Sequence, residues 1–387
     1  MSTGSCCVAE RPARVLHLRS SGGYYGAEAV IETLARAQAL DGIEVTVACL
    51  RDRRSPHTEL LDRLLGTRVA TRRIESRGRV DPWVPFRIAG VARRQSVDLL
   101  HVHDYKTILL GLPAAKALGI PWVTTFHGEV ADDRAVSAYE RAARQALRFC
   151  DGIAVVSRPQ QDQLRADGLA SQFLPNAVDI SGVQREVQAC RSGNATLRRS
   201  LGIPKSALVI GTVGRLCPDK GQMDAFAATE AAMGARTDVH WILAGEGEDR
   251  DRLRGRVAAS GVRDRIHLAG YVESRGALYG ALDVLLHPSH REGLSMVVLE
   301  AMAAGLAVVA TPVGEVGALI EQGRGLALAD RGPAIASALD SVLDDAQVRQ
   351  DLGQRALSHV QQQHSAPAMS QKYLHELYLP ALAGLSP

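Results

Sequence analysis

The feature that most constrains the fold is a series of short apolar segments, alternating with helical patterns, that runs along the chain and then starts again. The first series of predicted strands comprises 14–18, 44–50, 98–103, 121–126 and 152–156. The second comprises 207–211, 239–244, 266–268, 284–286 and 307–310. Strand, helix and strand at this spacing predict βαβ units and parallel sheets. The sequence therefore predicts an α/β protein with two successive modules.

The division between these modules falls in a polar helical segment near residues 180–205. A chain of 387 residues also has the length of two ordinary domains. We therefore assign 1–185 to a first domain, 186–365 to a second, and 366–387 to a C-terminal helix that crosses back to the first. Because ligands bind beyond the carboxyl ends of parallel strands, two such domains facing each other would enclose a cleft.

Composition excludes several other classes of protein. A net charge of +3 and the lack of a recognised motif give no support for a nucleic-acid partner. The six cysteines show no metal-ligand spacing and no disulfide framework. No uncharged apolar run reaches the roughly 18 residues of a membrane span, and the first residues do not form a signal peptide. We therefore expect a cytoplasmic protein.

The segment Arg51–Arg94 departs from this charge balance. It holds 12 arginines and five acids. An Arg-rich surface in contact with water would account for this excess. The alternative is a patch that meets anionic lipid headgroups, at the inner face of the membrane, or an anionic acceptor.

Two glutamates give the first chemical signal. Glu292 and Glu300 are separated by seven residues, and a helix is expected from about Ser295 to Ala304. A helix start offers unpaired N–H groups and a positive dipole end, which suit an anion. A carboxylate nearby can accept two hydroxyl donors of a sugar or ribose. The alternative is a pair of ordinary helix-surface acids.

A second signal is the loop Gly211–Gly221, which directly follows a predicted strand. Arg215 and Lys220 are two fixed cations in this loop, suited to a diphosphate whose negative charge grows as a sugar departs. Gly214 would allow close approach of the backbone. The alternative is that both cations are merely in contact with water.

With these landmarks in place, the sequence resembles the retaining glycosyltransferases of the GT-B fold, family 4, over nearly the whole chain. The motifs that carry this resemblance, in order, are the glycine-rich first loop, Thr125–Gly128, Val156-Ser157, Pro175–Asp179, Gly214-Arg215 with Lys220-Gly221, Ala244–Gly247, His287–Ser289 and the paired glutamates.

The resemblance implies a role for individual residues. Arg215 and Lys220 would hold the donor diphosphate, Glu300 the ribose hydroxyls, and Glu292 would lie against the transferred sugar. His127 would face that sugar across the cleft, with a structural histidine as the alternative. The other donor-side positions are Gly22, Gly23, Gly214, Gly245, Gly247, Tyr271, Val272 and the backbone N–H groups around Gly293, Leu294 and Ser295. A packing role remains an alternative for Tyr271 and Val272.

The first loop, Ser21–Glu28, departs from the family's simpler pattern of two glycines and an acid. Tyr24 and Tyr25 lie between the glycine pair and Glu28. They would either stack on an acceptor sugar or pack against the protein. Which acid takes the family's role after the glycines is left open.

His101 and His103 flank one strand residue, so both can face the same side of the sheet. No third convergent ligand is recognised in the sequence. We therefore expect no metal there, and place His103 and Asp104 on the acceptor side. We also expect no obligatory Mg²⁺ and no other cofactor.

The resemblance implies transfer of a sugar, with retained configuration, from a UDP-, GDP- or ADP-sugar to a glycan or lipid-linked acceptor. The first loop is similar to those of enzymes that build bacterial cell-surface polysaccharide. A nucleotide-sugar epimerase of the GT-B fold is one alternative. A non-catalytic protein that binds sugar nucleotides is another.

Overall fold

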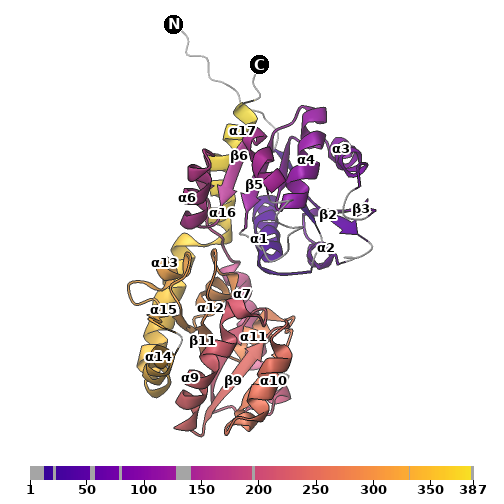
Figure 1. The fold of residues 1–387 in the computed structure, drawn as a ribbon. Coiled ribbons are helices and arrows are strands. Elements are labelled where there is room, and N and C mark those ends of the chain that lie inside the picture. Colours follow the sequence, from indigo (N-terminus) through magenta and orange to yellow (C-terminus); the bar gives the residue numbers. More distant parts are fainter. Residues whose placement is uncertain are drawn as a thin grey trace. The chain divides into compact units, whose positions relative to one another are not determined.

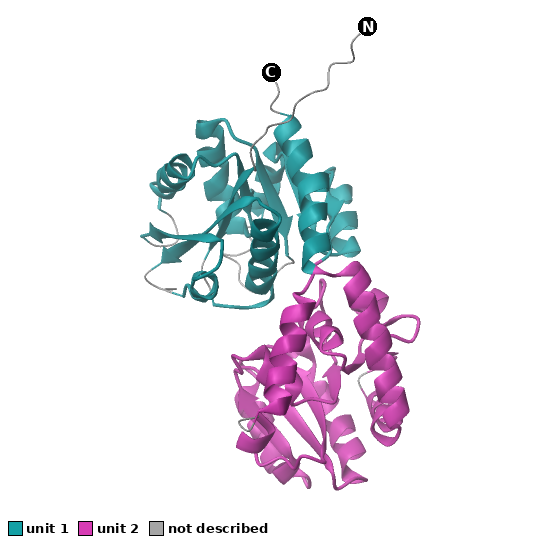
Figure 2. Cartoon of the chain, turned by 180° about the vertical axis from the view of Figure 1, so that it is seen from behind, with its two compact units in different colours: residues 1–175, 366–387 teal, residues 176–365 magenta. Residues whose placement is uncertain are grey.

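The computed structural model describes residues 13–20, 23–52, 57–77, 81–127, 141–193, 197–330 and 332–384. The chain forms two compact units, one of residues 1–175 with 366–387 and one of residues 176–365 (Figures 1 and 2). In Figure 2 the first unit is teal and the second is magenta.

Unit 1 is built on a seven-stranded parallel sheet with the order β3-β2-β1-β4-β5-β6-β7. Its strands are β1 (Arg14–Ser20), β2 (Glu44–Asp52), β3 (Ala70–Ser76), β4 (Leu99–Val102), β5 (Trp122–Phe126), β6 (Gly152–Val155) and β7 (Gln172–Phe173). Its helical elements before residue 176 include α1 (Gly26–Leu40), α2 (Glu59–Arg63), α3 (Val84–Arg94), α4 (Tyr105–Leu118), η1 (Leu147–Phe149) and α6 (Arg158–Ala166). The strands β1, β4 and β5 lie in the middle of the sheet; β4 and β5 are buried along their whole length, and β1 is buried from Val15 to Leu18.

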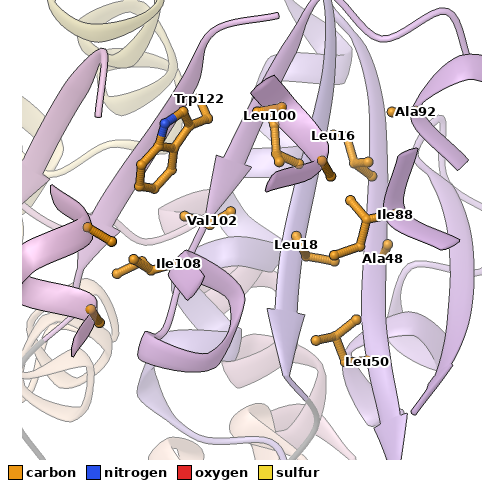
Figure 3. Packing of buried hydrophobic residues seen from close by; sticks show 14 of the residues in the cluster. Leu16, Leu18, Ala48, Leu50, Ile88, Ala92, Leu100, Val102, Ile108 and Trp122 are labelled. Carbon is orange, nitrogen blue, oxygen red and sulfur yellow. The ribbon is translucent and has the colours of Figure 1, made fainter. Parts of the chain in front are cut away.

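The core of unit 1 lies between this sheet and its covering helices. Leu16, Leu18, Leu100 and Val102 from β1 and β4 pack with Ile88 of α3 (Figure 3). Side chains that alternate across neighbouring parallel strands share one face, so a single apolar layer forms over the sheet. This layer holds the carboxyl ends of β1, β4 and β5 in fixed register.

Unit 2 contains a six-stranded parallel sheet with the order β10-β9-β8-β11-β12-β13. Its strands are β8 (Leu208–Val213), β9 (Val239–Ala244), β10 (Ile266–Gly270), β11 (Val284–His287), β12 (Ala307–Ala310) and β13 (Leu326–Ala327). Its helical elements are α7 (Ile180–Ser192), α8 (Leu197–Ser200), η2 (Pro218–Lys220), α9 (Gln222–Gly234), α10 (Arg250–Ala258), η3 (Arg263–Arg265), α11 (Arg275–Gly280), α12 (Met296–Ala303), α13 (Val316–Ile320), α14 (Pro333–Asp344) and α15 (Ala346–Gln363). This strand order, which runs outward in both directions from β8 and β11, is that of a doubly wound parallel sheet.

The C-terminal segment belongs to unit 1. It comprises α16 (Ala366–Lys372), the π-helical turn η4 (Tyr373–Tyr378) and α17 (Leu379–Ala383). Tyr373, Leu377 and Tyr378 are at most 1% exposed. A Cβ on Gly152 of β6 would lie 2.8 Å from Leu377, so the segment packs directly on the sheet.

The two parallel α/β units predicted from the sequence are confirmed. The compact units divide at 175/176, ten residues before the division placed at 185/186, because α7 packs against α11 and α12 of unit 2. The strands β3, β7 and β13 were not predicted. No helix among the described residues is long and apolar enough to cross a membrane.

Candidate active site

The loop after β8 carries both expected cations. Arg215 is exposed, and Lys220 ends the short turn η2. Gly221 follows with a φ of 68°, and a Cβ there would lie 2.2 Å from the carbonyl oxygen of Pro288. Only glycine fits this position. The close approach holds the Lys220 loop against the loop that follows β11.

Lys220 and Glu292 meet at this junction. The Lys220 Nζ donates to Oε1 of Glu292. The same oxygen accepts hydrogen bonds from Nε2 of His287, at 3.0 Å, and from Oγ of Ser289, at 2.9 Å. His287 is the last residue of β11 and is buried. The sheet therefore fixes the partners that orient the Glu292 carboxylate.

These partners determine the charge of Glu292. Burial by itself would raise the pKa of the carboxyl group, but the hydrogen bond and charge of His287 and the charge of Lys220 outweigh it and lower the pKa to about 2. Glu292 is therefore an anion held by Lys220, His287 and Ser289. An anion of this kind can accept hydroxyl donors at neutral pH.

Glu300 occupies the buried face of α12. Its Oε2 accepts a hydrogen bond of 2.7 Å from the hydroxyl of Tyr279, in α11, and its Oε1 lies 3.8 Å from Nη1 of Arg275. Arg275 also pairs with Glu186 of α7 at 2.9 Å. Burial, and then the charge of Glu300, raise the pKa of Tyr279 well above its usual value, so that Tyr279 stays a donor. The carboxylate is thus held in one orientation.

The turn before α12 has its carbonyl groups in use and its amides available. The carbonyl of Gly293 accepts from Glu315 N at 2.9 Å, and that of Leu294 accepts from Nδ2 of Asn176 at 3.0 Å. In the parts of the chain that the structure describes, the N–H groups of Gly293, Leu294 and Ser295 have no hydrogen-bond acceptor. Three adjacent unpaired amides at a helix start suit a phosphate or carboxylate.

The loop after β9 packs against the loop after β8. Gly245 has a φ of 147°, and a Cβ there would lie 1.9 Å from the carbonyl oxygen of Gly214. The Gly245 N–H donates to the carbonyl of Gly270, which ends β10. Tyr271, the next residue, is 59% exposed, and Val272 is half-buried. The structure therefore brings the expected donor-side positions Gly214, Gly245, Gly247, Tyr271 and Val272 to one edge of the sheet in unit 2.

In unit 1, the first loop is described from Gly23 onward, and Gly22 lies outside the described residues. The Tyr24 hydroxyl donates to Glu32 at 2.6 Å, which supports the packing interpretation for this tyrosine. Tyr25 is 64% exposed, and its backbone N–H donates to Glu28. Glu28 is buried and pairs with Arg19 at 2.7 Å.

Arg19 connects two acids at the carboxyl end of β1. Burial opposes its charge, but the carboxylates of Asp104 and Glu28 outweigh this and raise its pKa. Asp104 caps α4, accepting from Thr107 N at 2.9 Å and from Ser20 N at 2.7 Å. Its carboxylate therefore holds the start of α4, whatever else it contacts.

A chain of histidines runs beneath this edge of unit 1. Nδ1 of His17 lies 2.9 Å from Nε2 of His103, and Nδ1 of His103 lies 3.1 Å from Nε2 of His127. His17 supplies the third convergent imidazole that was not recognised in the sequence, because His17, His101 and His103 place ring nitrogens within 4.8 Å of one another. Each ring nitrogen of these three residues already has a hydrogen-bond partner. The geometry therefore fits a hydrogen-bonded core.

One further segment bears on metal binding. Asp249-Arg250-Asp251 has the Asp-x-Asp spacing, at the start of α10. Asp249 is buried and pairs with Arg252 at 2.6 Å, and Asp251 pairs with Arg254 at 2.9 Å. Both carboxylates are therefore engaged by arginines of their own helix.

Several residues of the site were missed by sequence reasoning. His287 and Ser289 lie in a motif that was noted without a role for either side chain. Tyr279 and Arg275 carried no signal, since neither lies in a motif or next to one. Tyr279 and Arg275 reach the site because α11 packs against α7, where Arg275 pairs with Glu186, and because Tyr279 of α11 contacts Glu300 of α12.

Comparisons with known proteins can be placed on this geometry. The family model Glycosyltransferase Family 4 matches residues 24–181, and the model Glycosyl transferases group 1 matches residues 194–359. A 2-deoxystreptamine glucosyltransferase of Streptomyces kanamyceticus is 32% identical over 241 residues, covering 57% of this chain and 61% of that protein. A glycogen synthase of Mycobacterium tuberculosis is 28% identical over 300 residues, covering 74% of this chain and 70% of that protein.

A 2-deoxystreptamine N-acetyl-D-glucosaminyltransferase of Streptomyces fradiae is 31% identical, covering 58% of this chain and 57% of that protein. The chain thus spans less than two thirds of both 2-deoxystreptamine-modifying relatives. A crystal structure of HepE from Anabaena with UDP and glucose covers 95% of this chain and all of its own, at a TM-score of 0.79 and 20% identity. At this identity the likeness concerns the fold, and it confirms the predicted GT-B fold.

The lowered pKa of Glu292 predicts how stability depends on pH. A carboxyl group with a pKa near 2 in the folded state and 4.5 as its ordinary value stabilises the fold above pH 4.5, and this contribution is lost as the pH falls toward 2. Glu292→Gln should therefore reduce the free energy of unfolding at pH 7 by about 1 to 3 kcal/mol. It should also flatten the acid side of the stability curve, as measured by urea unfolding between pH 6 and pH 3.

Glu248→Gln is the matched control, because Glu248 is exposed and lies in the neighbouring loop. It should leave the curve of the parent protein unchanged. If the free energy of unfolding falls equally steeply with pH in Glu292→Gln and in the parent protein, the folded state does not lower the pKa of Glu292.

Proposed function

This chain belongs to glycosyltransferase family 4, and on that premise we propose that it transfers a sugar from a nucleoside diphosphate sugar to a hydroxyl group. The observation that carries the proposal is the cluster in unit 2 that places Lys220, Glu292 and the unpaired amides of Gly293–Ser295 around one edge of the sheet. A glycosyl donor offers a diphosphate, a sugar and a ribose, and this edge offers cations, amides and carboxylates.

The diphosphate is the group that changes most during transfer. As the bond between the sugar and the diphosphate breaks, negative charge grows on the departing phosphate oxygen. We assign Arg215, Lys220 and the amides before α12 to that charge, because fixed donors aimed at developing charge lower the barrier. Arg215 and Lys220 both lie near Asp219, whose pKa is lowered first by its hydrogen bond to Arg291 and also by these two charges. The cations are therefore close neighbours.

The two carboxylates are assigned to the uncharged parts of the donor, which are the ribose and the transferred sugar. Glu300, oriented by Tyr279, is assigned to the ribose hydroxyls. Glu292, oriented by His287 and Ser289, is assigned to the transferred sugar. His127 in unit 1 is assigned to a hydroxyl of the same sugar. These roles come from the family resemblance, and the orientation of both carboxylates supports them.

Two further points concern the donor: which nucleotide base it carries, and whether its transfer needs a metal ion. HepE was crystallised with UDP, which makes a UDP-sugar the first donor to test, ahead of GDP- and ADP-sugars. Tyr271, exposed at the end of β10, is assigned to the base. We propose that no metal ion is required, since the cations that would stabilise the leaving group come from the protein.

For the acceptor we propose a hydroxyl of a glycan or a lipid-linked sugar, in the synthesis of bacterial cell-surface polysaccharide. A small aminocyclitol is a second candidate, favoured by two relatives whose names specify 2-deoxystreptamine. Transfer would retain the anomeric configuration, with the acceptor hydroxyl attacking from the leaving-group face and a phosphate oxygen taking its proton.

A lipid-linked acceptor would also give the Arg51–Arg94 region a function, at the inner face of the membrane. Trp83 and Phe86 are 62% and 70% exposed, and their rings lie 5.7 Å apart at the start of α3. Arg93 and Arg94 are exposed at the end of the same helix, whereas Arg51 and Arg73 pair with acids. Arg53, Arg54 and Arg79 lie outside the described residues. Exposed aromatic rings beside cations suit an anionic lipid surface.

The donor assignment predicts the effect of removing Lys220. A donor at 100 times its dissociation constant stabilises the folded protein by about 2.7 kcal/mol and raises its melting temperature. In a thermal-shift panel of UDP-, GDP- and ADP-sugars, Lys220→Ala should abolish the shift of the donor that binds.

Lys205→Ala is the control, since Lys205 is exposed elsewhere in unit 2, and it should keep the full shift. The shift should also persist in EDTA. An unchanged shift in Lys220→Ala would remove Lys220 from the phosphate site, and loss of the shift in EDTA with recovery on adding Mg²⁺ would contradict the metal-free proposal.

The stereochemistry of the product tests the mechanism. With the donor from the panel and a candidate acceptor, NMR of the new glycosidic bond should show the anomeric configuration of the donor. An inverted anomer would eliminate front-side transfer. Conversion of the donor without any acceptor would identify an epimerase. Binding of the donor with no nucleotide released for any acceptor would indicate a non-catalytic protein.

The membrane proposal predicts binding to vesicles that contain phosphatidylglycerol. Arg93→Gln with Arg94→Gln should weaken co-sedimentation about tenfold or more, since each arginine near an anionic surface contributes about 1 kcal/mol. Arg141→Gln with Arg148→Gln, two exposed arginines outside the region, is the control. Equal binding by both double variants would contradict a role for α3.

A further inference from the structure

The histidine chain of unit 1 ends at His127 and begins at a buried glutamine. Gln38 of α1 is 0% exposed, and its Oε1 lies 2.8 Å from Nε2 of His17. From there the chain passes through His103 to His127. His17 lies in β1, His103 follows β4 and His127 follows β5. These three strands are neighbours in the sheet, so the imidazoles lie in a row.

All the imidazoles of this row are neutral at pH 7. Burial lowers the pKa of His17 to about 4 and that of His127 to about 3, and it holds the pKa of His103 well below its usual value. A neutral imidazole has one nitrogen that donates and one that accepts. Consequently, the direction of any one hydrogen bond in the row fixes the direction of all the others.

The direction is set at Gln38. Its Oε1 can only accept, so Nε2 of His17 carries the proton and Nδ1 of His17 accepts. Nε2 of His103 then donates to His17, and Nδ1 of His103 accepts from Nε2 of His127. His127 is thereby left with an unprotonated Nδ1, for which no partner exists among the described residues.

The Gln38 amide also contacts the C-terminal segment. Nε2 of Gln38 donates to the hydroxyl of Tyr378 at 3.0 Å, and this hydroxyl lies 2.7 Å from Nδ1 of His101. Nε2 of His101 lies 2.8 Å from Oγ1 of Thr125. A hydroxyl that accepts from the amide can donate onward to His101. Rotation of the amide would therefore require the whole row to reverse.

We propose that Gln38 is a positioning residue that, through His17 and His103, fixes the Nε2–H tautomer of His127, so that Nδ1 of His127 accepts a hydrogen bond from a hydroxyl of the transferred sugar. The part that concerns the sugar rests on the proposed function. The part that concerns the tautomer rests on unit 1 alone. With the amide reversed, Nδ1 of His127 would carry the proton and could only donate, to a carbonyl, a phosphate or the oxygen of a hydroxyl, and could no longer accept from a hydroxyl.

The tautomer can be read without any substrate. In the full-length protein with ¹⁵N-labelled histidine, at pH 7 and in EDTA, two-bond ¹⁵N–¹H spectra distinguish a protonated ring nitrogen from a bare one. His127→Gln identifies the His127 signals. We expect Nε2 of His127 to be protonated and Nδ1 to be bare. A protonated Nδ1, or an equal mixture of tautomers, in the parent protein would overturn the proposal.

Two variants test the origin of this order. Gln38→Met keeps the length of the side chain but removes its acceptor, and Tyr378→Phe removes the hydroxyl to which the amide N–H donates. Each should give a mixture of tautomers at His127. Gln163→Met, at an exposed position of α6, is the matched control and should keep the parent spectrum. A single unchanged tautomer in both folded variants would show that Gln38 does not set it.

Activity separates this inference from the proposed function. In Gln38→Met, kcat/KM for transfer should fall about 3- to 10-fold, which is the effect of one lost hydrogen bond to a neutral group. The donor-induced shift in melting temperature should stay close to that of the parent protein. Unchanged kcat/KM despite mixed tautomers would overturn the sugar contact. Absence of any transfer by the parent protein would instead contradict the proposed function and leave the tautomer result standing.

Discussion

The contact between the Lys220 loop and the loop after β11 is the constraint on which the site depends. Parallel strands end at one edge of a sheet, but loops that follow them diverge unless something holds them together. Here Gly221 lies against the carbonyl of Pro288, and the N–H of His290 donates to the carbonyl of Asp219. A side chain at Gly221 would separate the two loops. If the loops separated, Lys220 would no longer contact Glu292. The Glu292 carboxylate would then lose the cation that compensates for its burial.

The buried carboxylates of unit 2 and the buried histidines of unit 1 are stabilised in different ways. In unit 2, the Glu292 carboxylate stays charged, because Lys220 and His287 lower its pKa, and the Glu300 carboxylate accepts a hydrogen bond from the Tyr279 hydroxyl. In unit 1, the histidines stay neutral, because burial disfavours their charge and every bond in the row pairs one donor with one acceptor. In the C-terminal segment, Tyr378 contacts Gln38 and His101, and Tyr373 contacts Thr125, which ties this segment to the interior of the first sheet. Unit 1 thus combines this neutral row with the charged cluster of Arg19, Glu28 and Asp104.

The sequence predicted the buried elements well and the marginal ones poorly. Strands such as β9 and β12 were placed at their observed bounds, since continuous apolar runs mark strands covered on both faces. The edge strand β3, with the sequence Ala-Thr-Arg-Arg-Ile-Glu-Ser, has few buried side chains and so carried no such pattern. The meeting of Lys220 with Glu292 was predictable from the positions of both after parallel strands. The contributions of Tyr279 and His17 were not, because they depend on which helices and strands become neighbours in space.

The central claim is that four loops of unit 2 form one binding surface for a nucleoside diphosphate sugar. Hydrogen–deuterium exchange of the protein with and without the donor tests it most directly, since bound ligand slows the exchange of the amides it contacts. The account predicts slower exchange in 214–221, 245–247, 270–272 and 293–296 together, at one donor concentration. Protection of only one of these segments, or protection confined to other parts of the chain, would contradict it.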